Sequence, residues 1–563
     1  MTTTLGRATA PPAATSPSYA NGPSRAPLLG TTIGDNLRAV ARAHAGAAAL
    51  VARHQDVRLS YAELDAAVDR VALALIGLGL HKGDRLGIWS PNRFEWVVLQ
   101  YATARAGVVL VNINPAYCVE ELGYSLRQSG VRALVTAAAF KGADYLDMLA
   151  ACNPPSSLEH VVVLGAAPRA GQLSWDDLER RGADADRETL TAREATLDPD
   201  DAINIQYTSG TTGSPKGATL SHHSILNNGF FVGEALRLTP ADRLCIPVPF
   251  YHCFGMVLGN LACTTHGATM VLPGEAFDPL AVLETVAAER CTALHGVPTM
   301  FIAELDHPRF AEFDLTSLRT GIMAGSPCPV EVMRQVVARM HMTEVTICYG
   351  MTETSPVSTQ SLPDDDVERR CTSVGQVHPH VEVKIVDPDG GRMQPRGVAG
   401  ELCTRGYSVM LGYWDNPQAT AAAIDGARWM HTGDLATMDA DGYVNIVGRI
   451  KDLVIRGGEN VYPREVEEFL HTHPAISEAQ VVGVPDARYG EELCACVRVR
   501  PGMTVDPEEV RDFCRGRIAH FKVPRYVVLV DEFPMTVTGK VQKYLLRQRM
   551  TAQLGLAEAV PTA

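Results

Sequence analysis

The chain of 563 residues lacks a hydrophobic run long enough to cross a bilayer comfortably. The apolar stretch 97–113, for example, is interrupted by Gln100 and Arg105. An excess of basic residues is also missing, because 64 acidic side chains outnumber 50 lysines and arginines and give a formal net charge of −14. Nucleic-acid binding needs a basic face. We therefore expect neither a membrane span nor nucleic acid as a main partner.

Metal-binding cysteine patterns are missing as well. The 13 cysteines are scattered and no Cys-x2-Cys pair occurs, so we expect reduced, mostly buried cysteines that act as small apolar residues. This usage is typical of the cytoplasm or the mitochondrial matrix. The pairs His222–His223 and His471–His473 are expected to be surface residues rather than metal ligands.

The ends of the chain differ in composition from its middle. Residues 1–28 are rich in Ala, Pro, Ser and Thr and contain Arg7 and Arg25 but no acid, which predicts a disordered tail. A transit peptide remains the alternative and would place the protein in the mitochondrial matrix instead of the cytoplasm. The whole chain has 46% hydrophobic and 20% charged residues, which is ordinary for a globular protein. Its length predicts more than one globular domain.

The most informative segment is residues 207–218, with the sequence YTSGTTGSPKGA. Residues 202–207 before it alternate between apolar and polar, as in a half-buried strand. Ser221 after it is a good N-cap for a helix. Glycines free backbone N–H groups to converge on anionic oxygens, hydroxyls add donors, and Lys216 adds a cation. The sequence therefore predicts a strand, a loop and a helix that together bind phosphate.

Two other interpretations of this segment are disfavoured. A flexible linker rarely follows a strand directly or lies in the middle of a domain. A Walker A loop needs Gly-Lys-Ser/Thr, whereas here Pro215 precedes Lys216 and Gly217 follows it. The segment therefore belongs to a different class of ATP-binding loop.

Residues 207–218 resemble the signature loop of the acyl-adenylate-forming (AMP-binding) superfamily, which includes acyl-CoA synthetases, peptide-synthetase adenylation domains and luciferases. Further motifs follow in the order that this superfamily uses: YGMTET at 349–354, HTGD at 431–434, GRIKD at 448–452, GGE at 457–459 and PMTVTGK at 534–540. The resemblance covers about residues 30–550. Within the superfamily, the sequence is most similar to the medium-chain fatty-acyl-CoA synthetases.

Alternating helix and strand patterns predict an α/β fold with mainly parallel sheets and crossover helices. We expect an N-terminal adenylate-forming domain over 29–449 and a small α+β C-terminal lid domain over 452–550, followed by a tail over 551–563. Within the lid, the patterns predict strands at 478–484, 492–499 and 525–530 and a helix over 507–518. The resemblance implies that the lid is mobile and rotates about a hinge at 450–451, in which Lys451 is the central residue.

The resemblance also implies roles for individual residues. The ATP loop comprises Thr208, Ser209, Gly210, Thr211, Thr212, Gly213, Ser214, Pro215 and Lys216. Around the adenine and the α-phosphate it implies Ala324, Gly325, Ser326, Tyr349, Gly350 and Thr352, with Glu353 as the Mg2+ ligand. Asp434 accepts from the ribose hydroxyls and Arg449 adds a fixed cation. Gly457, Gly458 and Glu459 line the path of coenzyme A, and Lys540 is the catalytic lysine.

Residues 244–274 contain no acidic side chain. Related domains that select amino acids place an aspartate here, because a buried ammonium group needs a partner. Its absence favours an uncharged, apolar carboxylic acid. By the resemblance, His252 lies beside the acid's carboxylate, and Phe250, Phe254, Gly255 and Met256 line the acyl pocket. An ordinary aromatic core cluster is the alternative interpretation of these residues.

The resemblance thus implies an AMP-forming fatty-acyl-CoA synthetase that uses ATP, Mg2+ and coenzyme A. The acid is first activated as acyl-AMP with release of pyrophosphate, and the acyl group then moves to the CoA thiol. A carrier protein in place of CoA is the alternative acceptor. A catalytically dead nucleotide sensor is disfavoured because Glu353, Asp434 and Lys540 are all present. A homodimer, and acetylation and deacetylation of Lys540 by partner enzymes, remain open.

Overall fold

The computed structural model describes residues 16–208, 215–326, 328–457, 459–535 and 541–556. The chain divides into two compact units. The larger consists of Ala20–Val383 and Thr404–His431, and the smaller of Met1–Tyr19, Lys384–Cys403 and Thr432–Ala563. The domain bounds expected from the sequence stay a prediction. In the described part of the chain, no helix combines the length and the apolar character that a membrane span requires.

The larger unit contains an eight-stranded sheet that is parallel except at one edge. Its order is β10 (Leu173–Ser174), β9 (His160–Leu164), β6 (Ala133–Ala137), β4 (Arg85–Trp89), β5 (Val109–Asn112), β11 (Ala202–Thr208), β12 (Lys216–Ser221) and β23 (Gly412–Tyr413). The last two strands run antiparallel to their neighbours. This edge therefore holds the end of the predicted ATP loop.

A seven-stranded sheet forms the second layer of the same unit. Its order is β17 (Glu344–Thr346), β16 (Thr320–Met323), β15 (Ala293–Gly296), β13 (Arg243–Cys245), β14 (Thr269–Leu272), β2 (Ala48–Ala52) and β3 (Val57–Ser60). Only the β2–β3 pair is antiparallel. Strands buried on both faces read as continuous apolar runs, as β14 (TMVL) does.

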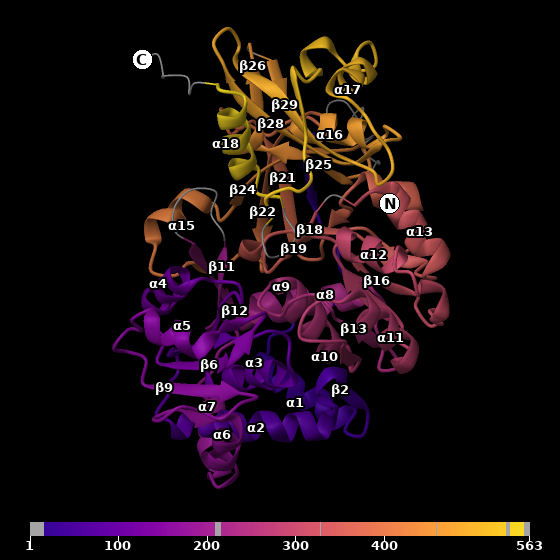
Figure 1. Cartoon of the computed structure of the whole chain (residues 1–563). Coiled ribbons are helices and arrows are strands. Elements are labelled where there is room, and N and C mark those ends of the chain that lie inside the picture. Colours follow the sequence, from indigo (N-terminus) through magenta and orange to yellow (C-terminus); the bar gives the residue numbers. More distant parts are fainter. Residues whose placement is uncertain (1–15, 209–214, 327, 458, 536–540, 557–563) are drawn as a thin grey trace, which may run out of the picture. The chain divides into compact units, whose positions relative to one another are not determined.

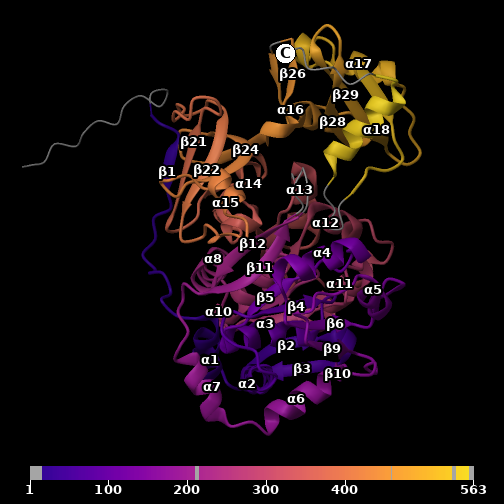
Figure 2. The ribbon, with the colours of Figure 1, turned by 90° about the vertical axis from the view of Figure 1, so that its left-hand side faces the viewer.

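Helices cover both faces of each sheet (Figures 1 and 2). Helices between the two sheets share one core with them: α1 (Ile33–Ala43), α2 (Tyr61–Gly77), α3 (Phe94–Ala106), α8 (His222–Ala235) and α10 (Ala262–His266). The outer face of the eight-stranded sheet packs against α4 (Val119–Ser129) and α5 (Tyr145–Ala151). The outer face of the other packs against α11 (Pro279–Glu289), α12 (Pro298–Leu305) and α13 (Val330–Arg339). The result is a layered α/β architecture, as predicted.

The smaller unit has an α+β core built on two long antiparallel strands, β28 (Ile476–Asp486) and β29 (Gly490–Val499). One apolar cluster joins them to α16 (Pro463–His471) and α17 (Pro507–Cys514), and another joins them to α18 (Lys543–Gln553). Also in this unit, β24 (Met430–Met438) pairs with β25 (Val444–Arg449) over residues 434–449. The strands predicted at 478–484, 492–499 and 525–530 are confirmed, the last as β30 (Tyr526–Leu529).

Three expectations from the sequence need correction. Between the ATP loop and α8 lies β12, so the motif is a hairpin followed by a helix rather than a strand, a loop and a helix. The helix predicted over 507–518 ends at Cys514, where Arg515 turns to an extended conformation. His222 is not a surface residue: it begins α8 and is fully buried, because Ser221 caps that helix inside the core.

Candidate functional site

The predicted ATP loop closes the hairpin of β11 and β12. Thr208 lies opposite Lys216 in the ladder, and its hydroxyl donates to the Lys216 carbonyl at 3.4 Å. Helix α4 holds both ends of the loop: the Tyr124 hydroxyl donates to the Pro215 carbonyl at 3.1 Å, and the Tyr207 hydroxyl donates to Gln128 at 2.6 Å. The loop residues Ser209, Gly210, Thr211, Thr212, Gly213 and Ser214 lie outside the described residues.

Glu353 lies in a short 3-10 turn, Thr352–Thr354, between β18 (Cys348–Gly350) and β19 (Val357–Gln360). The two strands approach so closely that a Cβ at Gly350 would lie 1.6 Å from the Pro356 carbonyl oxygen, so only glycine fits there. The Met410 N–H donates to the Glu353 carbonyl at 2.9 Å. The turn therefore holds Glu353 in place through its backbone, and the residue is only 5% exposed.

Tyr413 connects Glu353 to the lysine of the loop. Its hydroxyl donates to Glu353 Oε1 at 2.9 Å, and Lys216 Nζ lies 5.1 Å from the centre of its ring. Burial, and then the negative charge of Glu353, raise the pKa of Tyr413, so the phenol remains a donor. Sequence analysis missed this residue. Its contacts depend on the pairing of β12 with β23, which no local motif signals.

The carboxylate of Glu353 suits a divalent cation. Among the described residues no lysine, arginine or histidine forms an ion pair with it, although it is almost completely buried. A buried charge without an opposite charge is costly. A hard anionic oxygen is the ligand that Mg2+ prefers. The residues present therefore fit the predicted magnesium ion.

The predicted substrate residues surround the start of a helix. His252 is the residue before α9 (Cys253–Gly255), and its ring lies 4.3 Å from that of Tyr251. Phe250 is fully buried against Trp96. Phe254 is only partly buried and lies 5.5 Å from the His295 ring. The structure thus brings these residues to one region, while their contact with an acyl chain stays a prediction.

Met256 follows directly and begins a π-helical turn, Met256–Leu261, which leads into α10. Two buried amides donate to its sulfur: Asn112 Nδ2 at 3.2 Å and Gln206 Nε2 at 3.0 Å. Cys253 Sγ donates to Gln206 Oε1 at 3.2 Å. Burial raises the pKa of Cys253 to about 12, and the charge of Glu353 adds to this effect. Cys253 therefore remains a protonated thiol in this network.

The remaining predicted nucleotide residues of this unit lie at the ends of strands. Ala324 follows β16, and Gly325 has φ +94°, which a residue with a side chain rarely adopts. Ser326 precedes the undescribed position 327. Tyr349 lies in β18, opposite Thr359 of β19. Ligands of α/β proteins bind at carboxyl ends of parallel strands, and the end of β16 is such a position.

The other predicted residues belong to the smaller unit. Asp434 lies opposite Arg449 in the β24–β25 ladder, and Arg449 Nε donates to Asp434 Oδ1 at 2.9 Å. Lys451 lies in an exposed 3-10 turn, Ile450–Asp452. The N–H of Gly457 donates to the Tyr489 carbonyl at 2.8 Å. Glu459 is exposed and begins β27 (Glu459–Val461). Gly458 and Lys540 lie outside the described residues.

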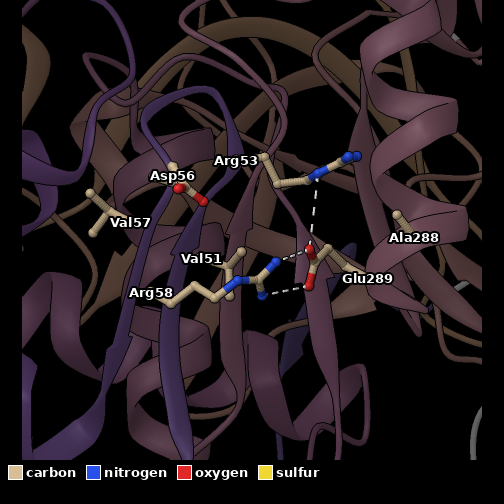
Figure 3. Close-up of a pocket in the computed structure, with 8 residues that line it drawn as sticks. Val51, Arg53, Asp56, Val57, Arg58, Ala288 and Glu289 are labelled. Carbon is tan, nitrogen blue, oxygen red and sulfur yellow. Dashed lines mark hydrogen bonds and ion pairs between the residues drawn. The ribbon is translucent and has the colours of Figure 1, made fainter.

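A separate pocket of about 380 Å3 lies in the larger unit, between the β2–β3 hairpin and the end of α11 (Figure 3). Glu289 is its central group. Arg58 NH1 donates to Glu289 Oε2 at 3.0 Å, Arg243 NH2 donates to the same oxygen at 2.7 Å, and Arg53 Nε lies 3.9 Å from Oε1. None of the residues that line this pocket was predicted as a site residue.

The chain matches the AMP-binding enzyme family over residues 37–414 and the AMP-binding enzyme C-terminal domain over 465–540. The putative acyl-CoA synthetase YngI of Bacillus subtilis is 47% identical over 548 residues, which cover 95% of this chain and 100% of that protein. The human mitochondrial medium-chain acyl-CoA ligase ACSF2 is 44% identical over 557 residues, covering 96% and 91%.

Solved structures show the same fold. The anthranilate CoA ligase AuaEII in complex with anthranoyl-AMP superposes with a TM-score of 0.84 at 29% identity, covering 94% of this chain and 99% of that one. A fatty acyl CoA synthetase of Mycobacterium tuberculosis superposes with a TM-score of 0.72 at 30% identity, covering 93% and 99%.

Proposed function

The chain belongs to the AMP-binding enzymes, and we propose that it is an ATP-dependent fatty-acyl-CoA synthetase, an acid–thiol ligase. It joins a carboxylic acid to the α-phosphate of ATP, releases pyrophosphate, and transfers the acyl group to the thiol of coenzyme A with release of AMP. The observation that carries the proposal is the buried carboxylate of Glu353, which forms no ion pair among the described residues and which Tyr413 connects to Lys216 at the end of the ATP loop.

The first half-reaction brings a carboxylate to a triphosphate, so like charges must be held together. Lys216, with the N–H groups of the loop, binds the β- and γ-phosphates. Mg2+, when bound by Glu353, offsets phosphate charge. Thr352 donates its hydroxyl to the α-phosphate, and His252 orients the carboxylate of the acid. Catalysis in this step is mostly positioning and charge neutralisation.

In the smaller unit, different residues serve the two half-reactions. Asp434 accepts from the ribose hydroxyls, and Arg449 stabilises the carboxylate of Asp434 and the nucleotide. Lys540 approaches the α-phosphate and the attacking carboxylate in the first step. Rotation at Lys451 then replaces Lys540 by Gly457, Gly458 and Glu459, which line the path of the thiol.

The acid is apolar and of medium chain length. The support comes from the stretch 244–274, which lacks acidic residues, and from relatives named medium-chain acyl-CoA ligases. Met256, whose sulfur accepts from two amides, lines the proposed acyl pocket together with Phe250, Phe254 and Gly255. An amino acid is a poor substrate because its ammonium group would be buried without a partner.

A panel of free acids tests the proposal. Pyrophosphate release and thioester formation are measured with and without CoA for hexanoate, octanoate, palmitate, phenylalanine and leucine. We expect octanoate or hexanoate to be activated fastest, and CoA to be acylated. Lys540→Ala is expected to abolish pyrophosphate release but to spare thioester formation from preformed octanoyl-AMP. An amino acid activated faster than both fatty acids, or equal damage to both half-reactions in Lys540→Ala, would contradict the proposal.

Three finer points complete the proposal. The protein acts in the cytoplasm, with the mitochondrial matrix as the alternative. It forms a homodimer, which the mass in solution tests. Acetylation of Lys540 by a partner enzyme removes its charge and stops the first half-reaction, and a deacetylase restores it. Mass spectrometry that never finds acetyl-Lys540 in cells would remove this last point.

A further inference from the structure

We propose that Tyr413 is a positioning residue for adenylation: its hydroxyl holds the Glu353 carboxylate in the orientation that meets the metal–nucleotide complex, and its ring holds the Lys216 ammonium. The inference rests on the proposed function, because it acts through the roles given there to Glu353 and Lys216. It assigns a task to a residue that no sequence motif had singled out.

The backbone around Tyr413 is fixed from two sides. The Leu411 N–H donates to the Thr219 carbonyl at 2.9 Å, and the Trp414 N–H donates to the Gly217 carbonyl at 2.7 Å. The Tyr413 N–H donates to the Thr420 hydroxyl at 2.9 Å. Residues 411–414 are thus attached to the strand that begins with Lys216. A shift of this strand would move Tyr413 with it.

Glu353 is held by the same segment. The Met410 N–H donates to the Glu353 carbonyl at 2.9 Å, and three residues later the Tyr413 hydroxyl donates to Glu353 Oε1 at 2.9 Å. A carboxylate has two oxygens, and a donor on one of them selects the rotamer and directs the other. No donor to the second oxygen, Oε2, lies in the described part of the chain, and this oxygen is the one proposed to hold the metal ion.

The ring of Tyr413 contributes separately. Lys216 Nζ lies 5.1 Å from the ring centre, within the range of a cation–π contact. One side chain therefore contacts both the carboxylate and the ammonium group of the proposed site. Its hydroxyl and its ring can be removed one at a time, so the two tasks can be separated by substitution.

The test uses the full-length enzyme and Mn2+ as the probe, in the presence of a non-hydrolysable ATP analogue. Mn2+ binding is followed by electron paramagnetic resonance, which needs no turnover. We expect Tyr413→Phe to raise the half-saturating Mn2+ concentration about 10-fold to 100-fold, as loss of a metal ligand's partner does. In the Glu353→Gln background the same substitution should change nothing further. Tyr413→Leu should in addition raise the KM for ATP, because it also removes the ring beneath Lys216.

Tyr61→Phe is the matched control. Tyr61 is fully buried, whereas Tyr413 is partly buried, and the Tyr61 hydroxyl donates to the Ala268 carbonyl at 2.7 Å. Removing the Tyr61 hydroxyl should therefore cost folding at least as much, without touching Glu353. Thermal unfolding of each variant shows that binding is measured on folded protein. If Tyr413→Phe binds Mn2+ within twofold of the wild type while Glu353→Gln binds it more weakly, the inference is wrong and the proposed function stands. If Glu353→Gln has no effect either, both the inference and the proposed role of Glu353 fail.

Discussion

Two nearly buried carboxylates in the larger unit have opposite surroundings. The side chain of Glu289 is 8% exposed and meets three guanidinium groups, those of Arg53, Arg58 and Arg243. Glu353 is 5% exposed, and the donor on its carboxylate among the described residues is the neutral hydroxyl of Tyr413. The two groups differ not in burial but in how their charge is balanced.

This difference in charge balance distinguishes a structural role for Glu289 from the proposed functional role of Glu353. The charge of Glu289 is balanced within the protein, so its network ties a hairpin to a helix and needs no ligand. Among the described residues no cation balances the charge of Glu353, which fits its proposed role as a metal ligand. The pocket beside Glu289 is thus accounted for by structure, whereas Glu353 is the carboxylate to which the proposed function gives a ligand.

The largest effect on activity is expected from Glu353, the carboxylate with the proposed role in adenylation. Glu353→Gln removes the charge but keeps an oxygen that can accept from Tyr413. We expect pyrophosphate release to fall about 100-fold to 1000-fold, the usual result of losing an electrostatic stabiliser of a transition state. The free energy of unfolding, measured in urea, should stay within about 1 kcal/mol of the wild type or rise, because an uncompensated buried charge is gone. A rate within tenfold of the wild type would show that Glu353 does not hold the metal.

The second prediction concerns Glu289, whose loss should affect stability rather than activity. Glu289→Gln leaves three arginines without their carboxylate, and we expect unfolding in urea to require about 3 kcal/mol less. Adenylation by the folded variant should be unchanged. The hydrogen bond from Arg58 holds the pKa of Glu289 below its ordinary value of 4.5. The contribution of this group is therefore complete above about pH 4.5 and is lost as the pH falls through the lower pKa of the folded state. Loss of adenylation without loss of stability would reverse the assignment.

The third prediction concerns His222, a second group that makes stability depend on pH and whose effect must be separated from that of Glu289. Burial lowers the pKa of His222 from 6.5 to about 4, so its neutral form is favoured in the folded state. The unfolded chain binds the proton first, and stability that is complete above pH 6.5 falls as the pH drops towards 4. We expect this one group to cost about 2 kcal/mol between pH 7 and pH 5.

Thermal unfolding at pH 7, 6 and 5 measures this effect. His222→Asn keeps an acceptor for the Ile33 N–H and should reduce the pH dependence. It should not abolish it, because burial also lowers the pKa of His295 to about 4 and that of His378 to about 3. An unchanged slope in the variant would mean that His222 is not the titrating group.

The smallest effect comes from the outer member of the arginine network. The side chain of Arg58 is 60% exposed, and Glu289 keeps Arg53 and Arg243 when Arg58 is removed. We expect Arg58→Ala to cost less than about 1 kcal/mol in urea unfolding, as exposed ion pairs do. The cost should decrease further at high salt. A cost equal to that of Glu289→Gln would show that the network acts as one unit.

Local patterns predicted most of the fold. The alternation at residues 202–207 became β11, and Ser221 does cap α8 through Ser224. The strand β12 was missed because its glycine and hydroxyl residues, and Pro215 just before it, are typical of a loop. It forms a strand because β11 and β23 flank it, and a flanking strand 190 residues later leaves no local trace. The ending of α17 at Cys514 could have been predicted, because Gly516 follows the C-cap Arg515 and has φ +72°, the usual stop signal of a helix.

The site was predicted unevenly. Motifs indicated Lys216 and Glu353 because the residue types needed for phosphate and magnesium are few. They did not indicate Tyr413, whose contacts require a strand pairing, or Gln206 and Asn112, whose amides meet the sulfur of Met256 through the packing of separate elements. The sequence therefore indicates the groups that contact a ligand more readily than those that hold them.

The π-helical turn at Met256–Leu261 determines the directions in which the side chains of the following helix, α10, point. Gln100 donates to the Met256 carbonyl at 3.1 Å, Tyr101 to that of Asn260 at 3.2 Å, and His295 contacts that of Leu258 at 2.9 Å. A π-turn accommodates one residue more than an α-turn, which advances every later side chain by about 100° around the axis. Deleting one residue here would rotate α10 relative to Phe254 and move the buried Thr264 away from Tyr101, whose hydroxyl it contacts at 2.8 Å. The extra residue of the π-helical turn therefore sets the rotation of α10 relative to Phe254.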